Sequence, residues 1–389
     1  MGMVMNTLIA LLASTLTLVS PENGAEYDTH TPCVKEFLSH YDERGVKPEV
    51  TAEELKDKYF NCFKRNAWSE DWLKRLEEEN KTYKPFSWKA DFPVNEAWVE
   101  FSETDDFAKP LVEWLRYGKK PFLAFRPGYL KVNQKYFWRV KAKDAADKEV
   151  ISDVRTFTTK DAFPRLMGEN GSNYRDVGGG VNADGKRIRQ GLLYRGGAAP
   201  VLDYPPQGVP STLETLKALF VDKFGCVGEL DLRGQDEGDE AEKKWRVIQL
   251  EKIGLKKICC PLVDYHIEHP HNLDMIPKCF HFLADKSNYP VYVHCAVGCD
   301  RTGTLFALLD GILGRTDRQV VDEYEISSLC RNLPRFRYGR KFGGLLSELS
   351  GDTALYGAKT VRENAEKYLL KIGVPQAEID AIRDIMIEK

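Results

Sequence analysis

Alternating apolar and polar residues dominate the first 160 positions of the chain and predict β-strands. The segment from Lys135 to Ala142 alternates most regularly, which is typical of an antiparallel sheet with one buried face. Similar strand-like runs occupy residues 86–90, 97–101 and 154–159. Residues 33–83 are instead charged and favour helix, so we expect an all-β domain over residues 18–160 that carries a helical insert.

Helical periodicity replaces this alternation towards the end of the chain. Apolar residues from Leu305 to Leu313 fall on one helical face and predict a helix over residues 302–313. Further helices are expected over 320–330 and 360–372, followed by a last helix that opens near Pro375. Residues 290–293 form a β-branched and aromatic run, which predicts a buried strand just before the first of these helices.

The loop between this strand and helix holds the clearest candidate chemistry. A loop in this setting aims successive backbone N–H groups at one point before the helix N-terminus, where partial positive charge favours a doubly charged oxyanion. Gly298 lets the backbone turn closely because it has no Cβ. The residues expected to bind phosphate are Ala296, Val297, Gly298, Cys299, Asp300, Arg301 and Thr302.

Cys295 is predicted to be the nucleophile at the base of this loop. The N–H groups and the helix dipole would stabilise its thiolate and bring the pKa from about 8.5 into the range of roughly 3.5 to 7.5. Arg301 can hold two phosphoryl oxygens with its planar fork, and the Thr302 hydroxyl can assist the thiolate when it leaves. The alternative is an ordinary buried thiol. The whole motif from His294 to Gly303, HCAVGCDRTG, instead favours two-step phosphoryl transfer through a phosphocysteine.

These residues resemble the phosphate loop of the cysteine-dependent protein tyrosine phosphatase superfamily. More narrowly, they are similar to the bacterial atypical tyrosine, serine and lipid phosphatases, whose loop is His-Cys-x-x-Gly-Lys-Asp-Arg-Thr-Gly. Three further segments match that group in the expected order: Asn173 to Gly179, Leu193 to Gly197 and Glu229 to Gly234. The resemblance runs from about residue 165 to the C-terminus. It implies an α/β (α+β) phosphatase fold over residues 161–389, with a central sheet flanked by helices.

One position departs from that group. Cys299 stands where the group has a lysine that is linked to lipid phosphate binding. The loss of this lysine argues against phosphoinositide substrates. Cys299 is either a redox partner that protects Cys295 as a reversible disulfide or a side chain that points away from the phosphate. We favour the second interpretation.

Hydrolysis also needs an acid that protonates the leaving oxygen. Asp264 follows a strand-like run about thirty residues before Cys295, as the general-acid loop of ordinary tyrosine phosphatases does. Asp300 lies in the phosphate loop, where the atypical group is thought to use an aspartate for acid catalysis or for ordering the loop. These two are equal candidates, and Asp231 ranks behind them as an acceptor that fastens its own loop.

Three arginines and a histidine complete the expected site. By resemblance Arg233 and Arg175 are candidates for lining it, although these two and Arg195 are also interpreted as structural ion-pair partners. His294 is expected to orient the loop from below. No cofactor or metal is implied, because the histidines at 266, 269 and 271 lie in a proline-rich loop without cysteines at zinc spacing.

Composition and charge limit the partners and the location that we expect for this protein. A net charge of −3 over 389 residues does not indicate a nucleic-acid surface, while the basic segment 331–341 is either a solvated loop or a rim that attracts anionic substrates. Residues 1–17 hold an apolar run that is too short to span a membrane and is typical of a signal peptide. Nine cysteines without regular spacing do not indicate a disulfide framework. We expect export in a bacterium, periplasmic, secreted or at the cell surface, without stable membrane insertion; a cytoplasmic protein is the alternative.

The sequence that follows, LTLVSPENGAEY, resembles the first strand and turn of bacterial fibronectin type III modules. Residues 18–160 are therefore expected to form a fibronectin type III-like sandwich. For the whole chain we predict a protein tyrosine phosphatase, with dual specificity as an option, that acts on a phosphorylated protein or a small phosphate monoester. The alternatives are an inositol phosphate or phosphoinositide phosphatase, and a phospho-ligand-binding pseudoenzyme or adhesion module.

Overall fold

The computed structural model describes residues 14–30, 32–45, 86–114, 129–166, 173–198, 212–238, 249–330, 335–337 and 341–389. These residues fall into two compact units, one built of strands and one of strands and helices. No helix among them is both long and apolar enough to cross a membrane. The predicted signal peptide lies mostly outside the described residues. Strand β1 (Leu16–Ser20) nevertheless buries Leu16, so the predicted boundary after residue 17 falls inside a strand.

The described part of the first unit consists of strands. They are β1, β2 (Ala25–Tyr27), β3 (Ser87–Ala90), β4 (Val94–Ser102), β5 (Leu111–Trp114), β6 (Lys135–Asp144), β7 (Glu149–Ile151) and β8 (Arg155–Thr159). β1 pairs with β3, and a six-stranded sheet has the order β2-β8-β6-β4-β5 with β7 added to β6. β6 buries every second residue from Tyr136 to Ala142, as its alternation predicts. The strand predictions are confirmed here, and the fibronectin type III resemblance stays a prediction.

Aromatic side chains fill the core of this first unit. The Phe86 ring lies between the rings of Tyr27, Phe101, Trp138 and Phe157, with centroid separations of 4.8 to 5.1 Å. Three of these four contacts are edge-on, the arrangement that aromatic pairs prefer. One ring therefore ties together four strands, β2, β4, β6 and β8.

A five-stranded sheet forms the centre of the second unit. Its order is β12 (Lys256–Cys259), β11 (Gly228–Asp231), β13 (Val291–Cys295), β10 (Leu193–Gly197) and β9 (Arg175–Asp176). Neighbouring strands are parallel, except that β9 runs antiparallel to β10. Parallel strands end at one edge of a sheet, and ligands bind at that edge in open α/β folds. The loops after β10, β11, β12 and β13 therefore meet where the candidate chemistry lies.

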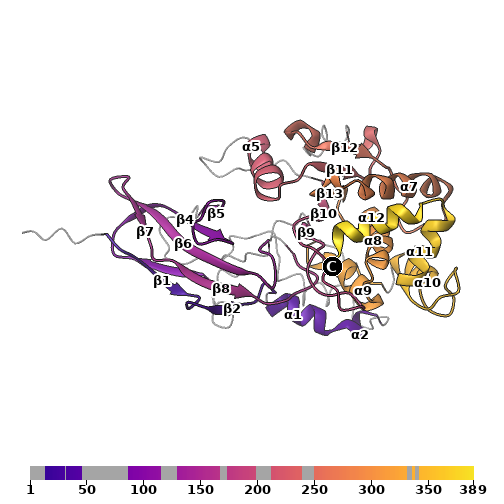
Figure 1. The fold of residues 1–389 in the computed structure, drawn as a ribbon, viewed down its shortest axis with the longest axis horizontal. Coiled ribbons are helices and arrows are strands. Elements are labelled where there is room, and N and C mark those ends of the chain that lie inside the picture. Colours follow the sequence, from indigo (N-terminus) through magenta and orange to yellow (C-terminus); the bar gives the residue numbers. More distant parts are fainter. Residues whose placement is uncertain are drawn as a thin grey trace, which may run out of the picture. The chain divides into compact units, whose positions relative to one another are not determined.

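Helices cover both faces of this sheet. They are α1 (Pro32–Ser39), α2 (Tyr41–Arg44), α5 (Thr212–Lys217), η1 (Ala218–Lys223), η2 (Leu250–Ile253), α7 (Pro270–Ala284), η3 (Lys286–Asn288), α8 (Asp300–Ile312), α9 (Asp317–Glu325), η4 (Ile326–Leu329), α10 (Lys341–Leu349), α11 (Val361–Lys371) and α12 (Gln376–Met386). Val291 and Val293 of β13 pack with the group of α7, α8, α11 and α12, whereas Tyr292 packs with α5 and η1. Figure 1 shows the strands between these two groups, which confirms the predicted central sheet flanked by helices.

The helix predictions hold closely in this unit. The helix expected over 302–313 is α8, and the one expected over 320–330 is α9 continued by the 3-10 turn η4. α11 begins after Thr360, whose side chain accepts a hydrogen bond from the N–H of Glu363, and the chain after it passes through Gly373 at φ 92°. Pro375 then precedes α12.

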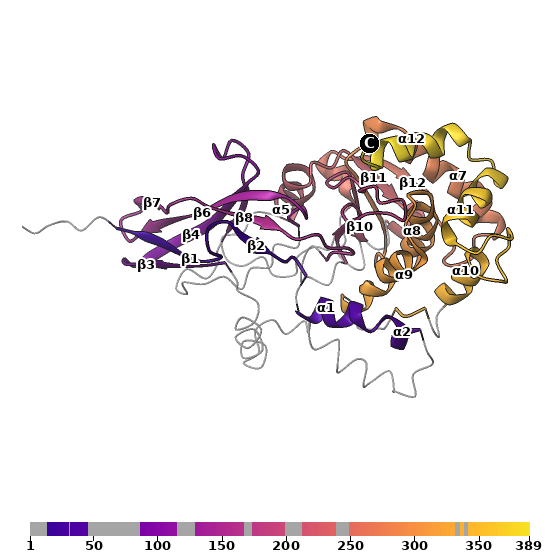
Figure 2. The same cartoon turned by 60° about the horizontal axis from the view of Figure 1, so that its bottom comes forward.

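The predicted helical insert is described in part, and the described part is helical. α1 and α2 are its described part, and they belong to the second unit instead of the strand unit. Phe37 of α1 stacks on Phe336 at 6.2 Å between centroids, and Arg44 of α2 forms an ion pair of 3.2 Å with Glu325 at the end of α9. Figure 2 shows α1 and α2 below α9. Residues 46–83 of the insert lie outside the described residues.

Candidate active site

The phosphate loop connects β13 to α8 at the carboxyl edge of the sheet. Gly298 has φ 68°, a left-handed conformation that side chains with a Cβ rarely adopt. A Cβ at this position would also overlap the backbone of Gly196 at the end of β10. Glycine therefore lets the loop turn tightly against β10, and the predicted phosphate-binding residues from Ala296 to Thr302 share one turn at the helix N-terminus.

Cys295 is the last residue of β13, and only 1% of its surface is exposed. Burial alone would raise the pKa of its thiol, but the charge of Arg301, the Thr302 hydroxyl and the N–H groups of Thr302 and Val297 together lower that pKa. The buried Thr302 hydroxyl has no other hydrogen-bond partner among the described residues. This environment favours a thiolate, the form in which cysteine acts as a nucleophile.

Arg301, in the first turn of α8, is held by a carboxylate from another loop. Its Nη1 lies 2.6 Å from Oε2 of Glu237 and its Nη2 lies 2.8 Å from Oε1, so the pair is bidentate. Glu237 follows β11, and the hydrogen bond from Arg301 lowers the pKa of its carboxyl group. Burial alone would lower the pKa of Arg301, but Glu237 and the Cys295 sulfur raise it. Both partners are therefore charged near neutral pH.

A buried ion-pair network supports the phosphate loop from behind. The Gly298 carbonyl accepts hydrogen bonds from Nδ2 of Asn173 at 2.9 Å and from Nη2 of Arg195 at 3.0 Å. Glu323 of α9 lies 3.2 Å from Arg195 and 2.9 Å from Arg175. Burial, followed by the charge of Arg175, lowers the pKa of Arg195 to about 10. Arg175 and Arg195 thus act as ion-pair partners that position the loop.

Cys299 is fully buried on the same side of the loop as this network. Its sulfur lies 3.3 Å from Nδ2 of Asn173 and 3.4 Å from the Val297 carbonyl oxygen. Cys299 and Cys295 are both thiols, not a disulfide. The contacts of Cys299 agree with a side chain packed inside the protein, and its redox role stays a prediction.

Asp231 is the weakest of the three acid candidates. Its carboxylate lies 2.9 and 2.8 Å from Nε and Nη2 of Arg233, within the same loop. Burial alone would raise the pKa of Asp231, but the charges of His294 and Arg233 lower it to about 2. A carboxyl group with this pKa has no proton to give near neutral pH. Asp231 instead fixes Arg233, whose buried Nη1 has no hydrogen-bond partner among the described residues.

His294 lies beneath the loop, beside Cys295. Its Nε2 is 2.8 Å from Oε1 of the buried Glu229. Burial alone would lower the pKa of His294, but Asp231 and Glu229 raise it. The imidazole is therefore held in place by acids of β11, which links the phosphate loop to the next strand of the sheet.

Asp300 and Asp264 lie on two segments that touch each other. The Tyr265 hydroxyl donates a hydrogen bond to Asp300, and Nε of Arg335 lies 3.0 Å from the same carboxylate oxygen. Asp300 is thus an acceptor that ties the phosphate loop to its surroundings. Asp264 directly precedes Tyr265, is half-buried, and has no hydrogen bond or ion pair to another described residue. Of the three aspartates, it is the one whose carboxyl group is not already engaged.

Comparison with known proteins gives the family of the chain. A model of the tyrosine phosphatase family matches residues 166–388, which include every residue described above around the loop. The chain belongs to this family. The crystal structure of the core catalytic domain of the PP-IP phosphatase SIW14 from S. cerevisiae in complex with citrate is similar at 17% identity. That match covers 46% of this chain and 91% of that chain, with a TM-score of 0.27. A structure of the Siw14 catalytic core is similar at 14% identity over 49% of this chain and 93% of its own, with a TM-score of 0.26. No curated protein matches the chain.

One group of residues in this tyrosine phosphatase domain has the composition of a metal site. The ligand atoms of Glu229, Asp231 and His294 all lie within 4.8 Å of one another. Each of these side chains already has a partner, however, since His294 binds Glu229 and Asp231 binds Arg233. We assign the group a structural role in holding the phosphate loop.

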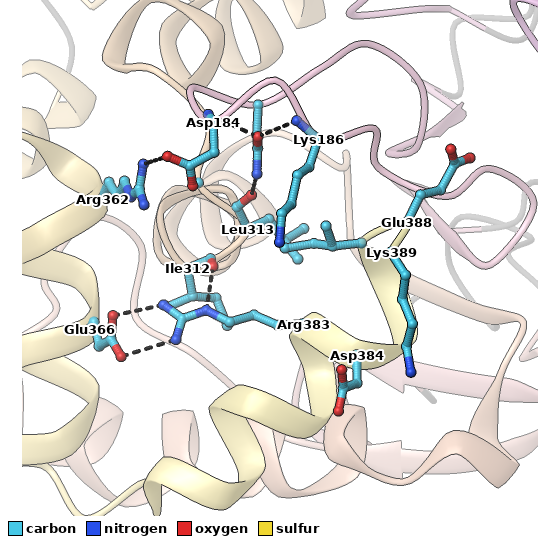
Figure 3. Close-up of a pocket in the computed structure, with 13 residues that line it drawn as sticks. Asp184, Lys186, Ile312, Leu313, Arg362, Glu366, Arg383, Asp384, Glu388 and Lys389 are labelled. Carbon is cyan, nitrogen blue, oxygen red and sulfur yellow. Dashed lines mark hydrogen bonds and ion pairs between the residues drawn. The ribbon is translucent and has the colours of Figure 1, made fainter.

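A polar pocket of about 380 Å³ lies at the far end of α8 from the phosphate loop. Figure 3 shows two pairs among its charged side chains, Arg362 with Asp184 and Arg383 with Glu366. The Arg383 pair has both of its N–O contacts at 3.0 Å or less. This pocket contains none of the predicted site residues, and the candidate phosphate loop lies at the other end of the helix.

Three residues around the loop, Glu237, Glu323 and Tyr265, were not predicted from the sequence, and Arg335 was expected only as part of the basic segment 331–341. Glu237 and Glu323 come from distant segments and pair with arginines that the sequence did point to. Tyr265 and Arg335 converge on Asp300 from either side of the phosphate loop in sequence. The signal available for Arg335 was the basic segment 331–341. In that segment Arg335 and Arg337 are both paired with acids, so they are not a solvated set of charges.

Proposed function

We propose that this protein hydrolyses phosphate monoesters through a phosphocysteine at Cys295. The single observation that carries the proposal is the placement of a buried cysteine with a lowered pKa beside Arg301, at the N-terminus of a buried helix. The N–H groups of Val297 and Thr302 and the charge of Arg301 act on this sulfur, and such donors would also stabilise a phosphoryl group in front of it. Membership of the tyrosine phosphatase family supports the same chemistry.

In the first step, the Cys295 thiolate attacks phosphorus, the S–P bond forms and the bond from phosphorus to the ester oxygen breaks. Arg301 and the loop N–H groups stabilise the charge on the equatorial oxygens. Asp264 gives its proton to the departing oxygen. In the second step, water attacks phosphorus and transfers a proton to the Asp264 carboxylate. Inorganic phosphate is released, and the Thr302 hydroxyl stabilises the thiolate as it leaves.

We assign the acid role to Asp264 because the carboxyl groups of the other two candidates already have partners. Asp231 stays ionised beside Arg233, and Asp300 accepts hydrogen bonds from Tyr265 and Arg335. Asp264 lies in the loop after β12, at the carboxyl edge where the phosphate loop also begins. Its neighbour Tyr265 donates its backbone N–H to Thr304 of α8 at 2.8 Å, which brings this loop to the helix that opens the site.

The substrate class that we propose is phosphotyrosine in proteins, with phosphoserine and phosphothreonine as a second, dual-specificity class. Membership of the tyrosine phosphatase family supports this choice. We further propose that the protein is exported from a bacterial cell, as the apolar run at its start suggests. An exported phosphatase would meet its phosphorylated partners outside the cytoplasm.

The experiment is hydrolysis of a small aryl phosphate by the wild type and by Cys295→Ser, with a metal chelator present. Phosphotyrosyl peptides, phosphoseryl peptides and inositol phosphates then give the substrate class. We expect turnover that survives the chelator, disappears in the variant and is fastest with phosphotyrosyl peptides. A folded, reduced wild type without turnover would refute the enzyme and leave a phospho-ligand-binding module. A preference for inositol phosphates would replace the substrate class only.

A further inference from the structure

Arg335 contacts the phosphate loop from the segment that follows η4. Its Nε lies 3.0 Å from Oδ1 of Asp300 and its Nη2 donates to Oδ2 at 3.3 Å, so both carboxylate oxygens are engaged. The Arg335 side chain is only 10% exposed, and its backbone N–H donates to the Ser328 hydroxyl at 2.7 Å. Asp300 directly precedes Arg301, so the orientation of Arg335 affects the backbone from which the phosphate-binding arginine extends.

The two residues after Arg335 contact the helical insert near the start of the chain. Phe336 stacks on Phe37 of α1 at 6.2 Å between ring centroids. Nη2 of Arg337 donates to the Tyr41 carbonyl oxygen at the start of α2 at 2.7 Å, and its guanidinium lies 4.2 Å from the centre of the Tyr41 ring. The segment that presents Arg335 to the phosphate loop is therefore held on its other side by the insert.

A buried carboxylate joins the same two elements to α9. Glu325 has a fully buried side chain, and its Oε2 lies 3.2 Å from Nε of Arg44 in the insert and 3.1 Å from Nη1 of Arg337. The other oxygen, Oε1, accepts the backbone N–H of Arg337 at 2.7 Å. A buried acid that lost either guanidinium would be left with uncompensated charge. The pairing therefore fixes α2 and the segment around Arg337 at the end of α9.

Apolar packing completes the attachment of the insert. Val34 and Phe37 of α1 form a small core with Phe336 and with two residues of η4, Ile326 and Leu329, and all five are buried. Figure 2 shows α1 beside this part of the chain. Burial of both apolar and charged groups makes α1 and α2 a built-in part of the second unit.

We propose that α1 and α2 position the phosphate loop through residues 335–337. Phe37 holds Phe336, and Arg335, its neighbour in the chain, holds Asp300 in the loop. This inference rests on the proposed function and adds a requirement to it, since residues 32–44 lie far before residue 166, where the family match begins. A purely stabilising role of the insert is an outcome of the test.

The test is a double-mutant cycle of Phe37→Ala and Arg335→Met, read as kcat for an aryl phosphate. Each single variant should lower kcat by about tenfold, because a catalytic group is misplaced while Asp300 keeps its hydrogen bond from Tyr265. If the insert acts through Arg335, the double variant also loses about tenfold, whereas independent effects would multiply to about 10²-fold.

Two further variants of α1 control for damage to the helix. Glu36→Gln changes the exposed neighbour of Phe37 and should stay within about twofold of the wild type. Phe37→Leu keeps much of the apolar contact and should recover most of the rate that Phe37→Ala loses. A product of losses in the double variant, or an equal loss in Glu36→Gln, would overturn the inference.

Hydrogen exchange gives a second readout that does not depend on turnover. In Phe37→Ala, amides of residues 335–337 and of the phosphate loop, 296–302, should exchange faster, while those of β13 stay protected. Arg335→Met should speed exchange in the phosphate loop alone. Faster exchange throughout the second unit, with β13 affected as much as the loop, would assign the insert a stabilising role only and refute positioning.

These outcomes separate the inference from the function on which it rests. A wild type that turns over aryl phosphate, with a Phe37→Ala variant that matches Glu36→Gln, refutes the role of the insert and leaves the phosphatase intact. A wild type without turnover refutes the phosphatase. In that case exchange in the phosphate loop still decides whether the insert positions it.

Discussion

Glu323 offers the sharpest test of how the phosphate loop is held. Its carboxylate is buried between two buried guanidinium groups, at 2.9 Å from Arg175 and 3.2 Å from Arg195. Substituting Glu323 with Gln keeps the shape but leaves two positive charges without their shared counterion. Removing one partner of a buried pair costs about 3–5 kcal/mol in the free energy of unfolding.

A neighbouring acid places the expected loss at the lower end of that range. Burial, followed by the like charge of Glu323, raises the pKa of Asp310 to about 7. Without Glu323 that pKa falls, and Asp310 ionises near Arg195 at neutral pH. We therefore expect Glu323→Gln to lose about 3 kcal/mol in the free energy of unfolding. If the free energy of unfolding falls by about 2 kcal/mol per molar urea, the urea concentration at the midpoint of unfolding of the second unit falls by about 1.5 M.

The assay is urea-dependent hydrogen exchange read by mass spectrometry on peptides from β10 and β13, which reports on the second unit alone. The matched control is Glu366→Gln. It breaks the half-exposed pair of Glu366 with Arg383, at 30% and 27% exposure, and should cost below about 1 kcal/mol. If Glu323→Gln loses no more stability than Glu366→Gln, the network does not hold the loop as described.

Three further changes test the site itself. Gly298→Ala should abolish turnover of aryl phosphate, because Gly298 has φ 68° and the new Cβ would overlap the backbone of Gly196; normal turnover would contradict this loop geometry. Asp264→Asn should lower kcat by about 10²-fold for phenyl phosphate and much less for a nitrophenyl ester, whose leaving group needs no proton; an equal effect on both would remove Asp264 from the acid role. Arg301→Met should raise the pKa of Cys295, so that alkylation by iodoacetamide at pH 6 to 7 becomes slower than in the wild type, whereas an unchanged pH profile would mean that Arg301 does not stabilise the thiolate.

Features encoded within a few neighbouring residues were predictable from the sequence. The strand at 290–293, the tight loop and the helix at 302–313 follow from local periodicity and from Gly298, and the structure has them as β13 and α8. Cys295 and Arg301 could be singled out because their spacing lies within one loop. The family match over residues 166–388 agrees with the motifs that pointed to a phosphatase.

Features that depend on which distant segments meet were not predictable. Glu237 and Glu323 are ordinary acids in the sequence, and only the fold brings them to Arg301, Arg175 and Arg195. The choice among the aspartates likewise depended on partners, such as the hydroxyl that Tyr265 presents to Asp300.

The insert shows the same limit at the scale of a whole element. Helicity of α1 and α2 followed from composition, but their packing could not be inferred, because Arg44 meets Asp322 at a separation of 278 residues. Periodicity identifies the apolar face of a helix and does not identify its partner.

The central claim is a covalent phosphocysteine at Cys295, and the most direct measurement is mass spectrometry of the protein quenched in acid during turnover of an aryl phosphate. The account predicts that the wild type gains the mass of one phosphoryl group and that fragmentation places it on Cys295. Cys295→Ser should show neither this gain nor turnover. Steady turnover without a modified cysteine, or turnover that persists in Cys295→Ser, would contradict the account.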